Sequence, residues 1–150
     1  MRTVLACFVC LWVFGCGAAS AQSFATLAEA EAMMERAAAY VEQHGSAEAA
    51  KTFMEPDGGF RDRDLYVSMS RISDGVRLAH FDPRMLGRSI ASSRDADGKP
   101  YGEMIRAIAL KDGAGRLDYR VVNPVTGKPM QKTGLIRRVG KVILVVGAYR

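Results

Sequence analysis

The C-terminal part of the chain carries the clearest pattern of apolar and polar positions, and it predicts three strands joined by two turns. Arg116–Val122 runs into Asn123-Pro124-Val125-Thr126-Gly127, a stretch dense in turn-forming residues. The chain returns through Thr133–Val139, turns at Gly140-Lys141 and continues as Val142–Tyr149. This last run is apolar and rich in β-branched residues, which predicts a central strand covered on both faces.

Helical spacing of apolar residues predicts a long helix at Thr26–Gln43. Thr26 followed by Glu29 fits a capping box, in which each side chain satisfies a free backbone N–H of the first turn. Apolar side chains recur along one side of this helix at Leu27, Ala30, Met34, Ala37, Ala38 and Val41. His44-Gly45 supplies a stop, and Ala47–Phe53 is predicted as a second, shorter helix.

Two further strands are predicted in the middle of the chain, after a loop at Met54–Phe60. Asp64–Ser70 and Val76–His80 form a β-hairpin around Ser73-Asp74-Gly75. Residues two apart on a strand share a face, so Tyr66 is predicted to lie on the same side as the polar residues Asp64, Ser68 and Ser70.

A crossing segment leads from this hairpin to the terminal strands. It begins at Asp82-Pro83, and Arg84–Ile90 forms a helical turn or a compact loop. After the polar stretch Ser92–Pro100, Tyr101–Lys111 is predicted as a clear helix. Its buried side is expected to carry Met104, Ile105 and Ile108.

This order of elements predicts an α+β fold with one five-stranded antiparallel sheet. A helix-containing connection joins an N-terminal hairpin to a C-terminal meander, and helices cover the faces of the sheet. The long N-terminal helix and the helical crossing segment match the layout of PAS-like sensor domains.

Residues 1–21 have the features of a cleavable signal peptide. Arg2 is followed by the apolar run Val4–Phe14, which is too short to span a bilayer, and then by the small-x-small site Ala19-Ser20-Ala21 before Gln22. Lipoprotein processing at Cys16 is the alternative. Cleavage leaves residues 22–150 as a single ligand-binding domain, periplasmic or secreted.

Charge and cysteine content narrow the class of partner. All three cysteines precede the cleavage site, so the mature chain has no disulfide and no thiolate chemistry. The net charge of +5 falls to +4 when Arg2 is removed, and the basic residues are scattered rather than interleaved with aromatics. A small organic anion therefore explains the charge better than nucleic acid, and we expect no nucleic-acid partner.

A set of short motifs in a fixed order resembles a single Cache domain, the extracytoplasmic relative of PAS. The motifs are Asp62-Arg63-Asp64-Leu65-Tyr66-Val67, Leu78-Ala79-His80, Asp82-Pro83, Leu86-Gly87, Asp95-Ala96-Asp97-Gly98-Lys99-Pro100, Glu103-Met104-Ile105, Asp118-Tyr119-Arg120, Asn123-Pro124, Lys132-Thr133, Arg138-Val139-Gly140 and Val146-Gly147-Ala148-Tyr149. The resemblance implies a sensory domain that binds a small ligand, often a short carboxylate, between the sheet and its crossing segment.

The chain departs from this family in two respects. Transmembrane and signalling parts are not recognised in it, which implies a stand-alone form acting through another polypeptide such as a membrane receptor or kinase. Arg116 and Leu135 occupy positions where aromatic pocket residues are expected. Either this change favours a more anionic ligand, or the pocket has degenerated.

Six residues are candidate ligand contacts: Tyr66, His80, Tyr101, Arg116, Tyr119 and Lys132. Arg116 and Lys132 supply charge for an anion, although basic residues on strands are usually solvated. His80 can donate to a carboxylate and gain from protonation, or its ring is satisfied by backbone or water. The tyrosines supply hydroxyl groups, or they pack within the sheet.

No metal site and no cofactor are expected. Asp95-Ala96-Asp97-Gly98 resembles part of a calcium loop, but placing Gly98 at loop position 6 puts Ser93 and Met104 where carboxylates belong. A catalytic group of Ser68 or Ser70, His80 and Asp82 is conceivable, but no nucleophile elbow surrounds it.

Three functions remain after this reading of the sequence. The first is a non-enzymatic sensor or accessory domain for a small carboxylate. The second is a ligand-free interaction module for a membrane signalling protein, with a homodimer formed through the alanine-rich N-terminal helix. The third, and most remote, is a weak hydrolase.

Overall fold

The computed structural model describes residues 24–150. The proposed signal peptide at 1–21, with Cys16, lies outside these residues. Within 24–150, no helix is both long enough and apolar enough to cross a membrane.

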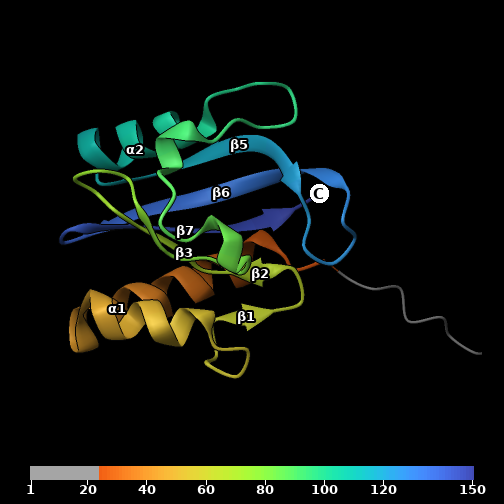
Figure 1. Ribbon diagram of the computed structural model, residues 1–150. Helices are drawn as coiled ribbons and strands as arrows, with labels where there is room; N and C mark the ends of the chain where they lie inside the picture. Colours follow the sequence, from red (N-terminus) through yellow and green to blue (C-terminus); the bar gives the residue numbers. More distant parts are fainter. Residues whose placement is uncertain (1–23) are drawn as a thin grey trace, which may run out of the picture.

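A five-stranded antiparallel sheet forms the centre of the fold, in the strand order β4-β3-β7-β6-β5 (Figure 1). Its strands are β3 (Ser68–Arg71), β4 (Arg77–Ala79), β5 (Ala114–Val122), β6 (Pro129–Val139) and β7 (Val142–Tyr149). Every residue of β7 is buried, and its neighbours are β3 and β6. The predicted fold class and the central position of this strand are therefore confirmed.

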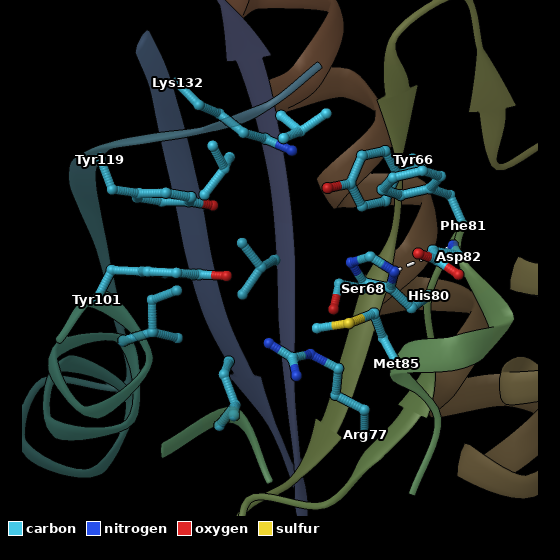
Figure 2. A pocket seen from close by; sticks show the side chains of 15 residues that line it. Tyr66, Ser68, Arg77, His80, Phe81, Asp82, Met85, Tyr101, Tyr119 and Lys132 are labelled. Atoms are coloured by element: carbon cyan, nitrogen blue, oxygen red, sulfur yellow. Dashed lines mark hydrogen bonds between the residues drawn. The ribbon is translucent and has the colours of Figure 1, made fainter. Parts of the chain in front are cut away.

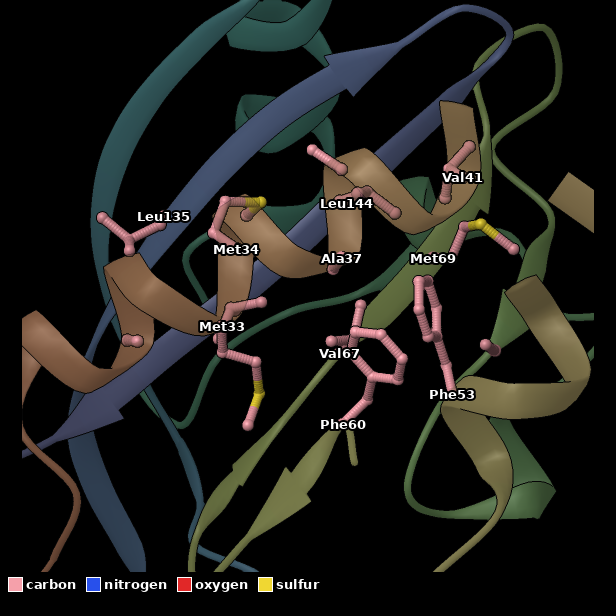
Figure 3. Packing of buried hydrophobic residues seen from close by; sticks show 14 of the residues in the cluster. Met33, Met34, Ala37, Val41, Phe53, Phe60, Val67, Met69, Leu135 and Leu144 are labelled. Carbon is pink, nitrogen blue, oxygen red and sulfur yellow. The ribbon is translucent and has the colours of Figure 1, made fainter. Parts of the chain in front are cut away.

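Helix α1 (Leu27–Met54) covers one face of the sheet. The capping box is present, and the helix is interrupted at Gly45, whose φ of 78° lies in the left-handed region. One side of α1 packs on Leu135, Leu144 and Val67, and its second segment brings Phe53 against Phe60 (Figure 3). The prediction of two helices separated at His44-Gly45 thus describes the backbone well.

The capping box offers a small, local test of this helix. Thr26 Oγ1 accepts the N–H of Glu29 at 3.2 Å, and Glu29 Oε2 accepts the N–H of Thr26 at 2.7 Å. We expect Thr26→Ala to lower the free energy of unfolding by about 1 kcal/mol in urea denaturation. Thr26→Ser keeps the acceptor and should remain close to wild type; equal losses in both variants would contradict this role for the cap.

The opposite face of the sheet is covered by α2 (Tyr101–Lys111) and the crossing segment. This segment contains two short 3₁₀ turns, η1 (Pro83–Met85) and η2 (Ile90–Ser92). A second apolar cluster lies here, comprising Ile90, Ile105, Ala109, Tyr119, Ile136, Ile143 and Val145. The alternation of β7 explains the two clusters, since Ile143 and Val145 face α2 whereas Leu144 and Val146 face α1.

Two local predictions are wrong. The stretch between Phe60 and Val67 contains a small hairpin of β1 (Arg61–Asp62) and β2 (Leu65–Tyr66), separate from the main sheet, because the chain reverses at Arg63, whose φ is 54°. Met104 does not belong to the buried side of α2; it is exposed, and Ala109 is buried in its place.

The alanine-rich side of α1 packs against the sheet of the same chain. Ala30, Ala37 and Ala38 are buried against the chain's own sheet, so these residues are not available for close contact with a second helix. The proposal that this alanine face mediates dimerisation is therefore wrong for these three positions.

Candidate functional site

A cavity of about 250 Å³ lies between the sheet and the crossing segment (Figure 2). Its lining comes from the sheet, from η1 and η2, and from the start of α2: Tyr66, Ser68, Arg77, His80, Phe81, Asp82, Met85, Ile90, Tyr101, Ile105, Tyr119, Val121, Val122, Lys132 and Val145. Five of the six predicted residues are brought together here, namely Tyr66, His80, Tyr101, Tyr119 and Lys132. Only Arg116 lies elsewhere.

Lys132 is buried in the wall of this cavity, with 2% of its surface exposed. Its side chain crosses the sheet over Gly147 of β7, where a Cβ would stand 2.7 Å from Lys132 Cε. The ammonium nitrogen sits 4.0 Å from the ring centre of Tyr66 and 4.6 Å from that of Tyr149, which stabilises the cation. The expectation that a strand lysine is solvated does not hold here.

The electrostatic environment of Lys132 is unusual. Burial lowers the pKa of its ammonium to about 7, and the charge of Asp64 opposes this shift only in part. Asp64 itself is held by the N–H of Ala25 and by the side-chain amide of Asn123. No salt bridge to Lys132 occurs within residues 24–150.

Arg77 is a second buried cation in the cavity, and it was not among the residues predicted from the sequence. It is 4% exposed, and its Nη2 donates to Ser93 Oγ at 2.6 Å. A register shift between Met69 and Ser70 sets the pairing of β4 with β3, so that Arg77 lies opposite Ser70. In the described part of the chain this guanidinium has no carboxylate partner.

His80 is held as a neutral hydrogen-bond donor. Its Nδ1 accepts the N–H of Asp82 at 3.1 Å, which leaves the proton on Nε2. Burial, followed by the positive charges of Arg77 and Lys132, lowers the pKa of the imidazole to about 4. Of the two roles offered for His80, a ring satisfied by the backbone fits the Asp82 contact, and the lowered pKa keeps the imidazole neutral near pH 7.

Tyrosines form much of the remaining wall. Tyr101 and Tyr119 stack with ring centres 4.5 Å apart and an interplanar angle of 8°. Tyr119 also lies over Gly134, where a Cβ would stand 2.8 Å from its ring. Burial raises the pKa values of Tyr66 and Tyr119 well above the ordinary value, so both hydroxyls stay protonated and can donate.

Arg116 lies on the other face of the sheet, which corrects its predicted place in the pocket. It pairs with Leu135 in the register of β5 and β6, and both residues point toward α1. Arg116 forms an ion pair with Glu31 of α1, and Leu135 is buried in the cluster beneath that helix. The cavity face of β5 instead carries Tyr119, three residues later.

The residues of the suggested hydrolase do not form a triad. The Asp82 carboxylate is paired with Arg84 at 2.8 Å, and it is the backbone N–H of Asp82 that contacts His80. Ser68 lines the cavity, whereas Ser70 does not. Hence the acid that would orient the imidazole is engaged elsewhere.

Metal ligands are not grouped in the described residues. Within residues 24–150, no three His, Cys, Asp or Glu side chains are close enough to hold an ion. Asp95 instead stabilises its own turn by accepting the N–H groups of Asp97 and Lys99, each at 2.9 Å.

Comparison with solved structures shows a fold shared with chemotaxis and chemosensory domains. No protein-family model and no curated protein matches the chain. A methyl-accepting chemotaxis protein from Vibrio parahaemolyticus RIMD 2210633 has a similar structure, with a TM-score of 0.68 and 17% identity over 81% of this chain and 86% of that one.

Two further solved structures resemble the chain, and each match covers 81% of it. One is a Cache chemosensory domain described in connection with carboxylic acid recognition, with a TM-score of 0.60, 21% identity and 86% of its own length covered. The other is the periplasmic sensor domain of a chemotaxis protein, with a TM-score of 0.58, 18% identity and 88% covered.

Proposed function

Because the chain has the PAS-like fold of Cache sensor domains, we propose that it is a non-enzymatic sensor or accessory domain for a small carboxylate. The ligand binds in the cavity between the sheet and the crossing segment. The Cache structure described in connection with carboxylic acid recognition supports this ligand class.

One observation carries the proposal: two buried cations, Lys132 and Arg77, face one cavity and form no salt bridge with residues 24–150, while the charge of Asp64 offsets the burial of Lys132 only in part. A buried charge without a counter-ion is costly, and an anion entering the cavity would offset that cost. Charge-assisted hydrogen bonds from an ammonium or guanidinium to a carboxylate are also among the strongest available to a protein.

Neutral donors and apolar surface would select a small organic anion over an inorganic one. The Nε2–H of His80 and the hydroxyls of Tyr66 and Tyr101 can donate to carboxylate oxygens. Phe81 and Met85 provide apolar wall for a short carbon chain. The cavity volume corresponds to roughly eight water molecules at about 30 Å³ each, which suits a compact ligand.

The proposal includes export and a partner. Residues 1–21 would direct the chain to the periplasm, where the domain transmits ligand occupancy to a membrane receptor or kinase. The crossing segment is the natural transmitter, since η1, η2 and the start of α2 all contribute to the cavity wall.

A thermal-shift panel tests this function. A ligand selective for the folded state stabilises it by about 2.7 kcal/mol at 100 times its Kd, which raises Tm by several degrees in a domain of this size. We expect at least one small carboxylate, tested among acetate, propionate, butyrate, lactate, pyruvate and succinate, to raise Tm. The matched amide should not do so. If no carboxylate shifts Tm, or if carboxylate and amide act equally, the proposed function is wrong.

Carboxylate affinity should depend on pH in a defined window. The groups that face Lys132 are Tyr66, Tyr149, Asp64 and His80. Burial raises the pKa values of both tyrosines and lowers that of His80 to about 4. A bound carboxylate raises the pKa of the Lys132 ammonium above its free value of about 7. The affinity for a carboxylate is therefore highest below pH 7, and it falls by up to about tenfold per pH unit as the pH rises above 7.

Isothermal titration calorimetry between pH 6 and pH 9 measures this dependence. The carboxylate ligand is ionised throughout that range and His80 is neutral throughout it, so neither contributes. An affinity that stays constant across the range would contradict the role of Lys132.

A further inference from the structure

The two buried cations lie at opposite ends of the cavity. Arg77 pairs with Ser70, which in turn pairs with Ile143 of β7, whereas Lys132 pairs with Tyr149 of the same strand. Ile143 and Tyr149 are six residues apart, a distance of roughly 20 Å along a strand at about 3.3 Å per residue. The long side chains of Arg77 and Lys132 thus enter one cavity from its two ends (Figure 2).

Each cation has its own polar surroundings. The Lys132 ammonium lies against the rings of Tyr66 and Tyr149, while the Arg77 guanidinium is fixed by Ser93 of the crossing segment. His80 lies close enough to both cations for each to lower its pKa.

The carboxylate that lines this cavity is not free to neutralise either end. Asp82 is engaged by Arg84 at 2.8 Å; the Arg84 side chain is 86% exposed, so this carboxylate is paired with a cation from the solvent side. A ligand with one acidic group would satisfy one cation and leave the other buried without a counter-ion.

We propose that the ligand is a short dicarboxylate, or a similar small molecule with an acidic group at each end, bound by Lys132 at one end and Arg77 at the other. This inference rests on the proposed carboxylate-binding function and specifies its ligand class. The Nε2–H of His80 lies between the two ends and donates to one of the two acidic groups.

Titration calorimetry with matched ligands tests the inference. Succinate and butyrate share a four-carbon chain and differ in one acidic group, and monomethyl succinate keeps the size of a diacid while it removes one charge. We expect succinate to bind about 100-fold more tightly than either monoacid, as loss of one buried charge pair implies. A series from malonate to adipate should show one preferred length.

Arg77→Gln removes the second charge and keeps a donor for Ser93. In this variant the preference for succinate over butyrate should disappear, so that the two affinities agree within about threefold. Retained butyrate binding also reports that the variant is folded; if it is not folded, the comparison of succinate with its monomethyl ester in the wild type decides the matter.

The outcomes separate the two levels of the proposal. If butyrate binds the wild type as tightly as succinate, the dicarboxylate inference is wrong and the carboxylate function stands. If neither the monoacids nor the diacids bind, the proposed function fails, and the inference fails with it.

Discussion

Lys132→Met should reduce carboxylate affinity at least about 100-fold and at the same time make the ligand-free protein more stable near pH 6. Methionine retains the apolar stem that lies against Tyr66 and Tyr149, but it removes the buried ammonium. Truncating one partner of a buried charge pair costs roughly 2–5 kcal/mol of binding free energy. The gain in stability arises because the wild-type cation is desolvated without a salt bridge in the described residues.

The pH dependence of stability gives this prediction a second measurable part. The folded pKa of Lys132, about 7, lies below the ordinary value of 10.5, so the unfolded chain binds the extra proton between these two values. The free energy of unfolding of the wild type therefore rises as the pH increases from 7 to 10.5, and Lys132→Met should lack this rise. Urea denaturation at several pH values measures it.

Lys128→Met is the matched control, because Lys128 is exposed in the turn before β6. It should leave both affinity and stability close to wild type. A Lys132→Met protein that binds carboxylates normally would remove Lys132 from the site, and one that is less stable than wild type at pH 6 would contradict the electrostatic description.

Gly102→Ala should destabilise the protein by about 3 kcal/mol, although the same change in an exposed helix position usually stabilises by about 1 kcal/mol. A Cβ at Gly102 would stand 1.7 Å from the carbonyl oxygen of Ile90 and 2.6 Å from its carbonyl carbon. These are backbone atoms of η2, so α2 must move away from the crossing segment. Because Tyr101 and Ile105 line the cavity, ligand affinity should fall as well.

Urea denaturation and calorimetry together test this packing. Glu103→Ala is the control in the same turn of α2; it removes only an exposed ion pair with Arg94, which contributes little. If Gly102→Ala is as stable as wild type or more so, the close contact between α2 and η2 does not exist in solution.

Much of the fold could be predicted from local patterns. The apolar run Val142–Tyr149 is a fully buried central strand, and Tyr101–Lys111 forms a helix with those bounds. Both elements bury side chains at the spacing that their sequence indicates, so tertiary packing reinforces the local preference. The left-handed conformation of Gly45 likewise ends the first helical segment where the sequence places a stop.

The errors at the site come from strand faces and register, which depend on tertiary pairing. Arg116 and Leu135 occupy one register pair, and assigning that pair to the cavity requires knowing which face α1 covers. Neighbouring residues of a strand lie on opposite faces, so an error of one residue in the register exchanges the faces. Arg116 was assigned to the cavity in this way, although the cavity face of its strand carries Tyr119.

Arg77 was missed because its burial depends on a local irregularity and on a distant contact. The register shift at Met69 and Ser70 sets its position in the sheet, and Ser93, sixteen residues later, fixes its guanidinium. The available signal was an arginine within the largely apolar run Val76–Ala79. Strand alternation alone would have put Arg77 on the face of Ala79, whereas the register shift puts it on the opposite, cavity face.

The most direct test of a carboxylate bound at Lys132 is a nuclear magnetic resonance titration of the lysine side chains, labelled at Cε and Nζ, with and without succinate. In the free protein one lysine, assigned through Lys132→Met, should titrate near pH 7. Saturating succinate should move that titration to higher pH, since the bound carboxylate stabilises the ammonium. If Lys132 titrates near 10.5 in the free protein, or if its signal is unaffected by every carboxylate in the panel, the assignment of this cavity as a carboxylate site is wrong.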